Sequence, residues 1–174
     1  TISSATVDLN ANVTTTAGGA NGKVTINAGA GDKDGLAVSL ADGKSITTTA
    51  AEDSGLVSGG IEINSDGDVS LVGNLVTTGV ANTTGGTGAA GGEVTIDTTG
   101  AATISISDIT TTGGASKATG GMGGAAGEIT LNTNTGVITL NSSTITAAGG
   151  AGDAQQGAGA SITFSDAVVL AGGA

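Results

Sequence analysis

A short phrase of alternating residues recurs five times along this chain at nearly constant spacing. It places an aliphatic residue, a polar residue and a second apolar residue before Asn, Asp or Ser. The copies lie at 24–27, 61–64, 94–97, 129–132 and 162–165, so they begin 37, 33, 35 and 33 residues apart. Periods of about 20–50 residues are typical of repeat architectures, in which one structural unit stacks on the next. The sequence therefore predicts a repeat fold.

Each of the first four copies is followed by two more short extended segments, here called limbs, and then by a glycine-rich excursion. The second limbs lie at 7–9, 38–40, 69–71, 104–106 and 138–140, and the third limbs at 13–16, 46–49, 76–79, 109–112 and 145–148. The long excursions cover 79–92, 113–127 and 147–160, and removing them leaves 19 or 20 residues per repeat. Three limbs of four or five residues plus corners use that remainder, which is one turn of a three-sided β-solenoid.

We therefore expect an all-β fold, a right-handed parallel β-helix with Gly-rich loop excursions. Residues 1–174 form one solenoid domain of about five turns, or rungs, with an incomplete first rung and a last limb at 168–170. Parallel strands of successive rungs would pair about 4.8 Å apart, and parallel crossovers are usually right-handed. Two interior ladders follow from the alternation: Ile26, Ile63, Ile96, Leu131 and Phe164 form one, and Val24, Ile61, Val94, Ile129 and Ile162 the other.

The composition excludes several classes of partner. Fifteen acidic residues against four lysines give a formal charge of −11. This balance opposes binding to nucleic acid, which needs cations to neutralise phosphates, and docking on anionic membranes. No apolar run approaches the roughly 20 residues that span a bilayer. Cysteine and histidine are absent, so thiolate and imidazole metal sites are excluded.

We expect no enzymatic activity. Polysaccharide lyases and hydrolases exist among parallel β-helices, but the only basic side chains of this chain are four lysines. Asp66 and Asp68 are the closest carboxylate pair that could serve a glycosidase. Because they flank Gly67, a solvated turn is the better interpretation.

No cofactor is expected, and calcium is the one metal that the residues permit. Asp32, Asp34, Asp66 and Asp68 supply hard oxygen ligands of the kind that Ca²⁺ prefers, although the spacing of an EF-hand is not met. Calorimetry with millimolar calcium on chelator-treated protein tests this hypothesis, and the absence of heat would remove it.

Rows of threonine suggest a further hypothesis, ice binding. Outward Thr-X-Thr pairs are expected on the third limb at 14/16, 47/49 and 110/112, and the pattern weakens to Thr77/Gly79 and Thr146/Ala148. Exposed strands favour β-branched threonine in any case, and thermal hysteresis of the purified protein decides between the two interpretations.

The glycine-rich excursions have the composition of flexible linkers. They recur at the same place in each repeat, so we expect them to stack on one another along one edge. Their small side chains would let backbones approach closely, and lateral contacts between fibres are one use of such a surface.

The repeat resembles the filamentous haemagglutinin-like and autotransporter-like exoproteins. The likeness is carried by Gly-Gly-Glu93-Val-Thr-Ile96, by Gly-Glu128-Ile-Thr-Leu131, and by the 104–106 and 109–114 segments that follow the first of these. It implies a right-handed parallel β-helix in an adhesin, stalk or surface fibre. On that basis we expect an extracellular or cell-surface structural segment that pairs with copies of itself end to end. The alternative is an adhesin stalk that binds glycans.

Overall fold

The computed structural model describes residues 1–18, 22–31, 34–141 and 144–171. Across those ranges the chain forms seventeen β-strands and no α-helix, and the strands assemble into three parallel sheets. Since none of these residues lies in an α-helix, the described part of the chain contains no helical membrane span.

Each sheet takes one strand from each rung. Sheet A contains β1 (Ile2–Ser4), β4 (Val24–Ala28), β7 (Ile61–Ser65), β10 (Val94–Thr98), β13 (Ile129–Asn132) and β16 (Ile162–Phe164). Sheet B contains β2 (Val7–Leu9), β5 (Leu36–Leu40), β8 (Asp68–Leu71), β11 (Ile104–Ile106), β14 (Val137–Asn141) and β17 (Ala167–Ala171). Sheet C contains β3 (Val13–Thr15), β6 (Ser45–Thr49), β9 (Asn74–Thr78), β12 (Ile109–Thr112) and β15 (Ile145–Ala148).

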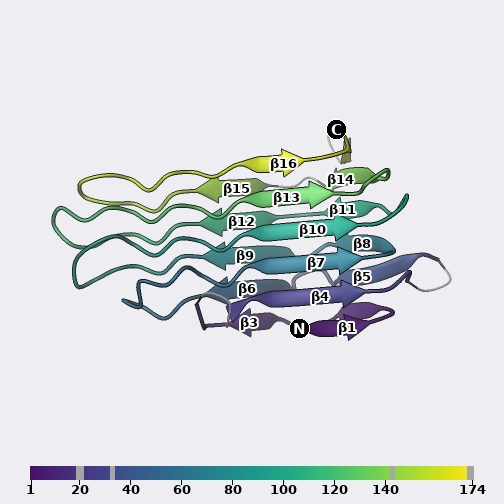
Figure 1. The fold of residues 1–174 in the computed structure, drawn as a ribbon, viewed down its shortest axis with the longest axis horizontal. Coiled ribbons are helices and arrows are strands. Elements are labelled where there is room, and N and C mark those ends of the chain that lie inside the picture. The colour runs from purple at the N-terminus through teal and green to yellow at the C-terminus, as the bar shows by residue number, and fades with distance from the viewer. Residues whose placement is uncertain (19–21, 32–33, 142–143, 172–174) are drawn as a thin grey trace.

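The fold is the right-handed, three-sided parallel β-helix that the sequence predicts. In Figure 1 the N-terminus lies at the bottom, and the near strands β4, β7, β10 and β13 run to the right. Behind them β6, β9, β12 and β15 run back to the left, and each next near strand lies one level higher. A chain that turns in this sense while it rises is right-handed.

Both predicted interior ladders of sheet A are confirmed. The register pairs Ile26 with Ile63, Ile96 with Leu131 and, at the last rung, Leu131 with Phe164. In the middle rungs these side chains are 0% exposed. Because burial of each contributes roughly 1.5–3 kcal/mol and no rung can bury its own face, stability comes from the contact between neighbouring rungs.

The first rung is complete, and our prediction that it lacks a first limb is wrong. β1 supplies that limb, since Ile2 pairs with Ile26 and Ser4 with Ala28. The segment has one aliphatic residue where the other rungs have two, so it does not match the repeated phrase.

The third limb of the third rung is also shifted from our prediction by one residue. Leu75, and not Val76, pairs with Ile46 and Ile109. Both residues are aliphatic, so the alternation fits either register, and a slip of one residue exchanges the two faces of a strand. Leu75 is consequently buried while Val76 lies on the outer face.

The excursions stack as predicted, and they form hydrogen-bonded layers. In Figure 1 the connections β9–β10, β12–β13 and β15–β16 extend together to the left of the coil. Backbone bonds join successive layers, for example Asn82 N–H to the Ala115 carbonyl at 2.9 Å and Ser116 N–H to the Ala151 carbonyl at 2.8 Å. The glycine-rich segments are therefore a second, flat part of the structure beside the three-sided coil.

Truncation of a central ladder residue tests the packing of the coil. We expect Ile96→Ala to lower the free energy of unfolding by about 2–5 kcal/mol, because it leaves a cavity between rungs that are closed above and below. The neighbouring outward substitution Thr95→Ala serves as the control and should change stability by less than about 0.5 kcal/mol. Chemical denaturation measures both, and equal losses would contradict the assignment of faces.

Candidate functional site

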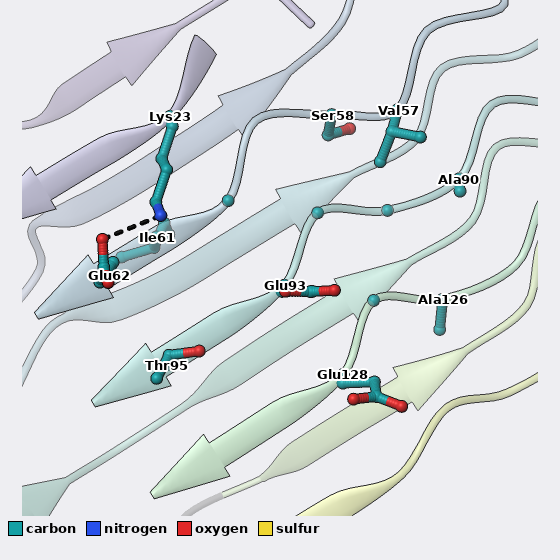
Figure 2. Close-up of a pocket in the computed structure, with 14 residues that line it drawn as sticks. Lys23, Val57, Ser58, Ile61, Glu62, Ala90, Glu93, Thr95, Ala126 and Glu128 are labelled. Atoms are coloured by element: carbon teal, nitrogen blue, oxygen red, sulfur yellow. Dashed lines mark ion pairs between the residues drawn. The ribbon is translucent and has the colours of Figure 1, made fainter. Parts of the chain in front are cut away.

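A groove follows the line where the returning excursions enter sheet A. Its volume is about 600 Å³, and it crosses the rungs that begin with β4, β7, β10 and β13. Figure 2 shows Glu62, Glu93 and Glu128 on successive rungs along one side, with Val57, Ala90 and Ala126 along the other. The lining residues are Lys23, Val57, Ser58, Gly60, Ile61, Glu62, Ala90, Gly91, Gly92, Glu93, Thr95, Ala126, Gly127 and Glu128.

Close backbone stacking determines which residues form the floor of the groove. A Cβ on Gly92 would lie 2.2 Å from the Gly59 carbonyl oxygen, and one on Gly127 would lie 2.0 Å from the Gly92 carbonyl oxygen. Contacts below 3.0 Å with a backbone atom require the chain to move. The contact between rungs thus requires glycine at these positions. Because glycine has no side chain, the groove above them stays open.

Buried threonine hydroxyls hold that floor in place. The hydroxyl of Thr111 on β12 donates to the Gly127 carbonyl at 2.6 Å, and Thr15 on β3 donates to the Gly22 carbonyl at 2.6 Å. Thr48 and Thr77 make the same bond to Gly59 and Gly92. Each bond ties sheet C to the glycine that lies two residues before the next strand of sheet A.

Sequence reasoning missed this row of threonines. The expected register put Thr77 on the outer face, whereas Thr48, Thr77 and Thr111 are each 0% exposed. The sequence does contain a usable signal. Most third limbs have a Thr at their third position, and in the same repeats a Gly lies two residues before the next copy of the phrase. In the last complete rung Ala147 takes the threonine's place.

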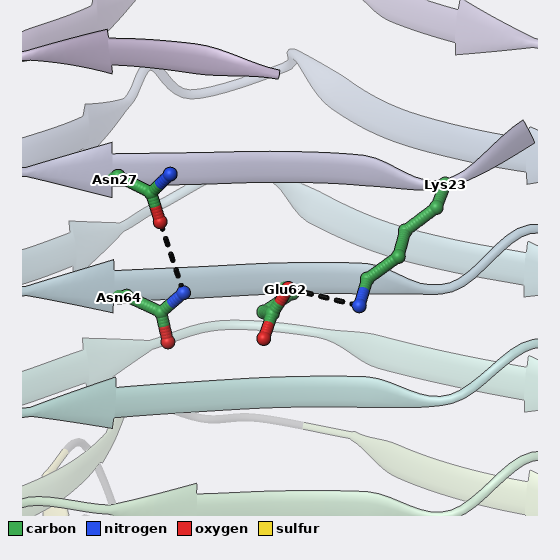
Figure 3. A network of polar contacts seen from close by, with 4 residues as sticks. All are labelled: Lys23, Asn27, Glu62 and Asn64. Atoms are coloured by element: carbon green, nitrogen blue, oxygen red, sulfur yellow. Dashed lines mark hydrogen bonds and ion pairs between the residues drawn. The ribbon is translucent and has the colours of Figure 1, made fainter. Parts of the chain in front are cut away.

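The charged residues of the groove differ in their partners. Figure 3 shows the Lys23 ammonium beside the Glu62 carboxylate, with 2.8 Å between nitrogen and oxygen. The hydrogen bond from Lys23 lowers the pKa of Glu62 below its ordinary value. Glu93 and Glu128 are exposed, and neither forms an ion pair with a described residue. Two free carboxylates therefore face the solvent along the groove, where they can accept hydrogen bonds from hydroxyl or amine groups.

Polar side chains near the ends of the sheet A strands bridge neighbouring rungs. Asn64 donates to Asn27 at 3.0 Å (Figure 3), and Asn132 donates to Asp97 at 3.2 Å. These two pairs add side-chain hydrogen bonds to the backbone pairing of sheet A.

The structure gives two of the calcium candidates partners within the protein. Asp66 accepts a hydrogen bond from the Thr99 hydroxyl at 3.0 Å, and Asp68 accepts one from the Thr103 N–H at 2.7 Å. Asp34 is exposed, and Asp32 lies outside the described residues. Within the described ranges no three metal-ligating side chains come together, so calcium binding stays a hypothesis that rests on the type of ligand.

The outward threonine rows are less regular than ice binding requires. On sheet C the outer positions of the third rung are held by Val76 and Thr78, because of the shifted register, in place of Thr77 and Gly79. Thr47 and Thr110 are the neighbours of Val76 on either side. An aliphatic residue thus interrupts the central position of one of the two rows.

Comparisons of the chain with protein-family models, with curated proteins and with solved structures find no match. The fold assignment therefore stands on the strand register and the three sheets alone.

Removal of one buried hydroxyl tests the link between sheet C and the groove floor. We expect Thr111→Val to lower the free energy of unfolding by about 1–3 kcal/mol, because the Gly127 carbonyl loses a buried donor while the side-chain volume is kept. Thr110→Val, on the outer face of the same strand, is the matched control and should have little effect. Chemical denaturation measures the free energy of unfolding of both variants. Equal losses would contradict a stabilising role for the buried Thr111 hydroxyl.

The Lys23–Glu62 pair gives a prediction for pH dependence. Lys23→Met should raise the pKa of Glu62 toward its ordinary value, as followed by NMR titration of the carboxyl carbon. Because the folded-state pKa is lowered, the pair stabilises the fold above the unfolded-state pKa, and this contribution is lost as the pH falls through the folded-state pKa. For a pair at the surface the gain is below about 1 kcal/mol. Lys44→Met is the control, and an unchanged Glu62 pKa in the Lys23 variant would contradict the assignment.

Proposed function

We propose that this chain is a structural segment of an extracellular β-solenoid fibre or surface appendage, in which coils stack end to end by strand pairing. The observation that carries the proposal is the state of the two end rungs. They present the same inward residues as the middle rungs, but without a neighbour to cover them.

The exposed fractions along each ladder make this difference quantitative. Ile162 is 38% exposed, whereas its register partner Ile129 is 0% exposed. In sheet B the Val168 side chain is 40% exposed and its partner Ile138 is 0% exposed. At the opposite end Ile2 is 36% exposed and its partner Ile26 is 0% exposed. A further coil on either end would bury side chains that are already aligned for it.

The backbone of the end strands supports the same proposal. β16 and β17 have a paired strand on one side only, as have β1, β2 and β3 at the other end. Open strand edges are templates for strand addition. The two ends differ from each other, so their contact is heterologous, and contacts of this kind generate open filaments when the rotation does not close a ring.

The polar, acidic exterior supports a soluble fibre. Outward strand positions carry Thr and Ser, and the net charge of −11 opposes side-by-side association of copies. The extracellular setting rests on the resemblance to surface exoproteins.

A second candidate function is glycan binding by an adhesin stalk. The groove beside sheet A favours it, because Glu93 and Glu128 offer free carboxylates to sugar hydroxyls over several rungs. An adhesin segment should stay monomeric and should lose binding when both glutamates are changed to glutamine.

Electron microscopy and sedimentation of the purified chain test the fibre proposal. We expect filaments with an axial repeat near 4.8 Å. Leu170→Lys, which places a charge on the exposed end of sheet B, should shorten or abolish them. Val72→Lys is the matched control, since Val72 is 47% exposed at a corner of the coil and not at its end. A chain that stays monomeric at millimolar concentration would contradict end-to-end stacking.

A further inference from the structure

The three long excursions, called layers 1 (79–92), 2 (113–127) and 3 (149–160), are joined by a regular set of backbone bonds. Layers 1 and 2 each donate four N–H groups upward. From layer 1 the donors are Gly79, Asn82, Gly88 and Gly91, and their acceptors are the carbonyls of Thr112, Ala115, Met122 and Ala125. From layer 2 the donors are Gly113, Ser116, Gly123 and Ala126, and their acceptors are the carbonyls of Ala148, Ala151, Gln155 and Ala158.

These donors are three residues apart on each limb of a layer. Gly113 and Ser116 lie on the outward limb of layer 2, and Gly123 and Ala126 on the returning limb. An interval of three residues is that of the polyproline II helix, which has three residues per turn and forms no internal hydrogen bonds. The spacing thus indicates a hairpin of two polyproline II limbs in each layer, and the backbone bonds join each hairpin to its neighbours in the stack.

A continuous chain of hydrogen bonds runs through the middle of the stack. Gly157 donates to Gly150, which donates to Gly124 in the layer below, at 2.8 Å in both bonds. The chain continues from Gly124 to Gly114 at 2.8 Å, from Gly114 to Ala89 at 2.7 Å and from Ala89 to Val80 at 3.1 Å. It alternates between bonds inside one hairpin and bonds to the next hairpin down.

This central chain requires two glycines in every layer that lies on another full layer. A Cβ on Gly150 would lie 2.0 Å from the Gly114 oxygen, and one on Gly157 would lie 1.8 Å from the Gly124 oxygen. In layer 1, which lies on the shorter excursion 50–60, the same two places are taken by Val80 and Ala89. The glycines therefore mark contact with a layer below.

The top of layer 3 presents the same donors without acceptors. The residues equivalent to the four donors of layer 2 are Gly149, Gly152, Gln156 and Gly159, by the register of the bonds below them. None of their N–H groups bonds to another described residue, and the Gly157 carbonyl, the free end of the central chain, accepts no backbone bond there.

We propose that this face binds a glycine-rich hairpin in the polyproline II conformation, supplied by a further coil. Four carbonyls of the hairpin would accept from the free N–H groups of layer 3, and one glycine N–H would donate to the Gly157 carbonyl. The contact continues the interface that already joins layer 1 to layer 2 and layer 2 to layer 3. The inference rests on the proposed function for the presence of a further coil, and it specifies the kind of coil.

The first rung of a second copy does not meet this specification. Its strands β3 and β4 are separated only by positions 16–23, whereas β9 and β10 are separated by 79–93 and β12 and β13 by 113–128. A second copy turned upside down would set N–H groups against N–H groups. The occupant is therefore a coil with a long glycine-rich excursion, like those of the third to fifth rungs.

A peptide that copies residues 112–128 tests the proposal by NMR on the full chain. The peptide carries all four acceptors and the central donor of layer 2, and it contains almost none of the three sheets. We expect the amide signals of Gly149, Gly152, Gln156 and Gly159 to shift saturably, and their hydrogen exchange to slow by about tenfold or more. The control peptide carries Gly114→Ala and Gly124→Ala, whose methyl groups would meet the backbone below, and should leave the four signals unchanged.

Three outcomes would overturn the proposal. The first is that neither peptide moves the four signals at millimolar concentration, and the second is that both peptides move them equally. The third is a change of the Gly152 and Gln156 signals with protein concentration alone. These two N–H groups lie farther from the coil than Gly149 and Gly159, so copies that stack through their sheets would leave them uncovered, and such a change would make a second copy the occupant. Since the peptide can bind whether or not the chain forms filaments, failure here is distinguishable from failure of end-to-end stacking.

Discussion

Parallel backbone pairing between successive rungs is the interaction on which the rest of this structure depends. It repeats in all three sheets, so each inward residue lies on its counterpart. The pairing of β5 with β8 contains one irregularity, a register shift between Leu36 and Val38. The aliphatic ladders, the threonine–glycine bonds and the stacked layers all follow from it. If neighbouring rungs slipped by one residue, buried and exposed faces would exchange along the slipped strand.

The sequence predicts the coil well because its repeat is carried by side chains that must face inward. Ile63, Ile96 and Leu131 could be placed from alternation and spacing alone. The sequence predicts the position of a strand poorly in two situations. In one, two registers satisfy the same alternation, as at Leu75 and Val76, and in the other a limb has only one aliphatic residue, as in β1. In those places the contact with neighbouring rungs determines the strand register. A local sequence pattern does not contain that contact.

The candidate site was harder to foresee for a related reason. Glycine in the excursions could be interpreted as flexible linker, since composition does not distinguish freedom from close packing. The buried threonine hydroxyls bond to glycines 7 to 16 positions further along the chain, such as Gly127 for Thr111. These residues meet only after the connecting excursion has folded back. Glu93 and Glu128 are ordinary surface residues in the sequence and become neighbours through the period of the coil.

The tips of the layers explain how a chain with such strict stacking can still vary in length. Gly85, Gly86 and Gly120 have positive φ angles at the tips. The tip segments differ in length, at 83–87, 117–122 and 153–155, without any shift in the bonded limbs. Insertions are thus absorbed at the turn, while duplication of a whole repeat adds one strand to every sheet and one layer to the stack. Such a protein can evolve by changing the number of its repeats and the residues at the tips of its layers, while the cross-section of the coil stays constant.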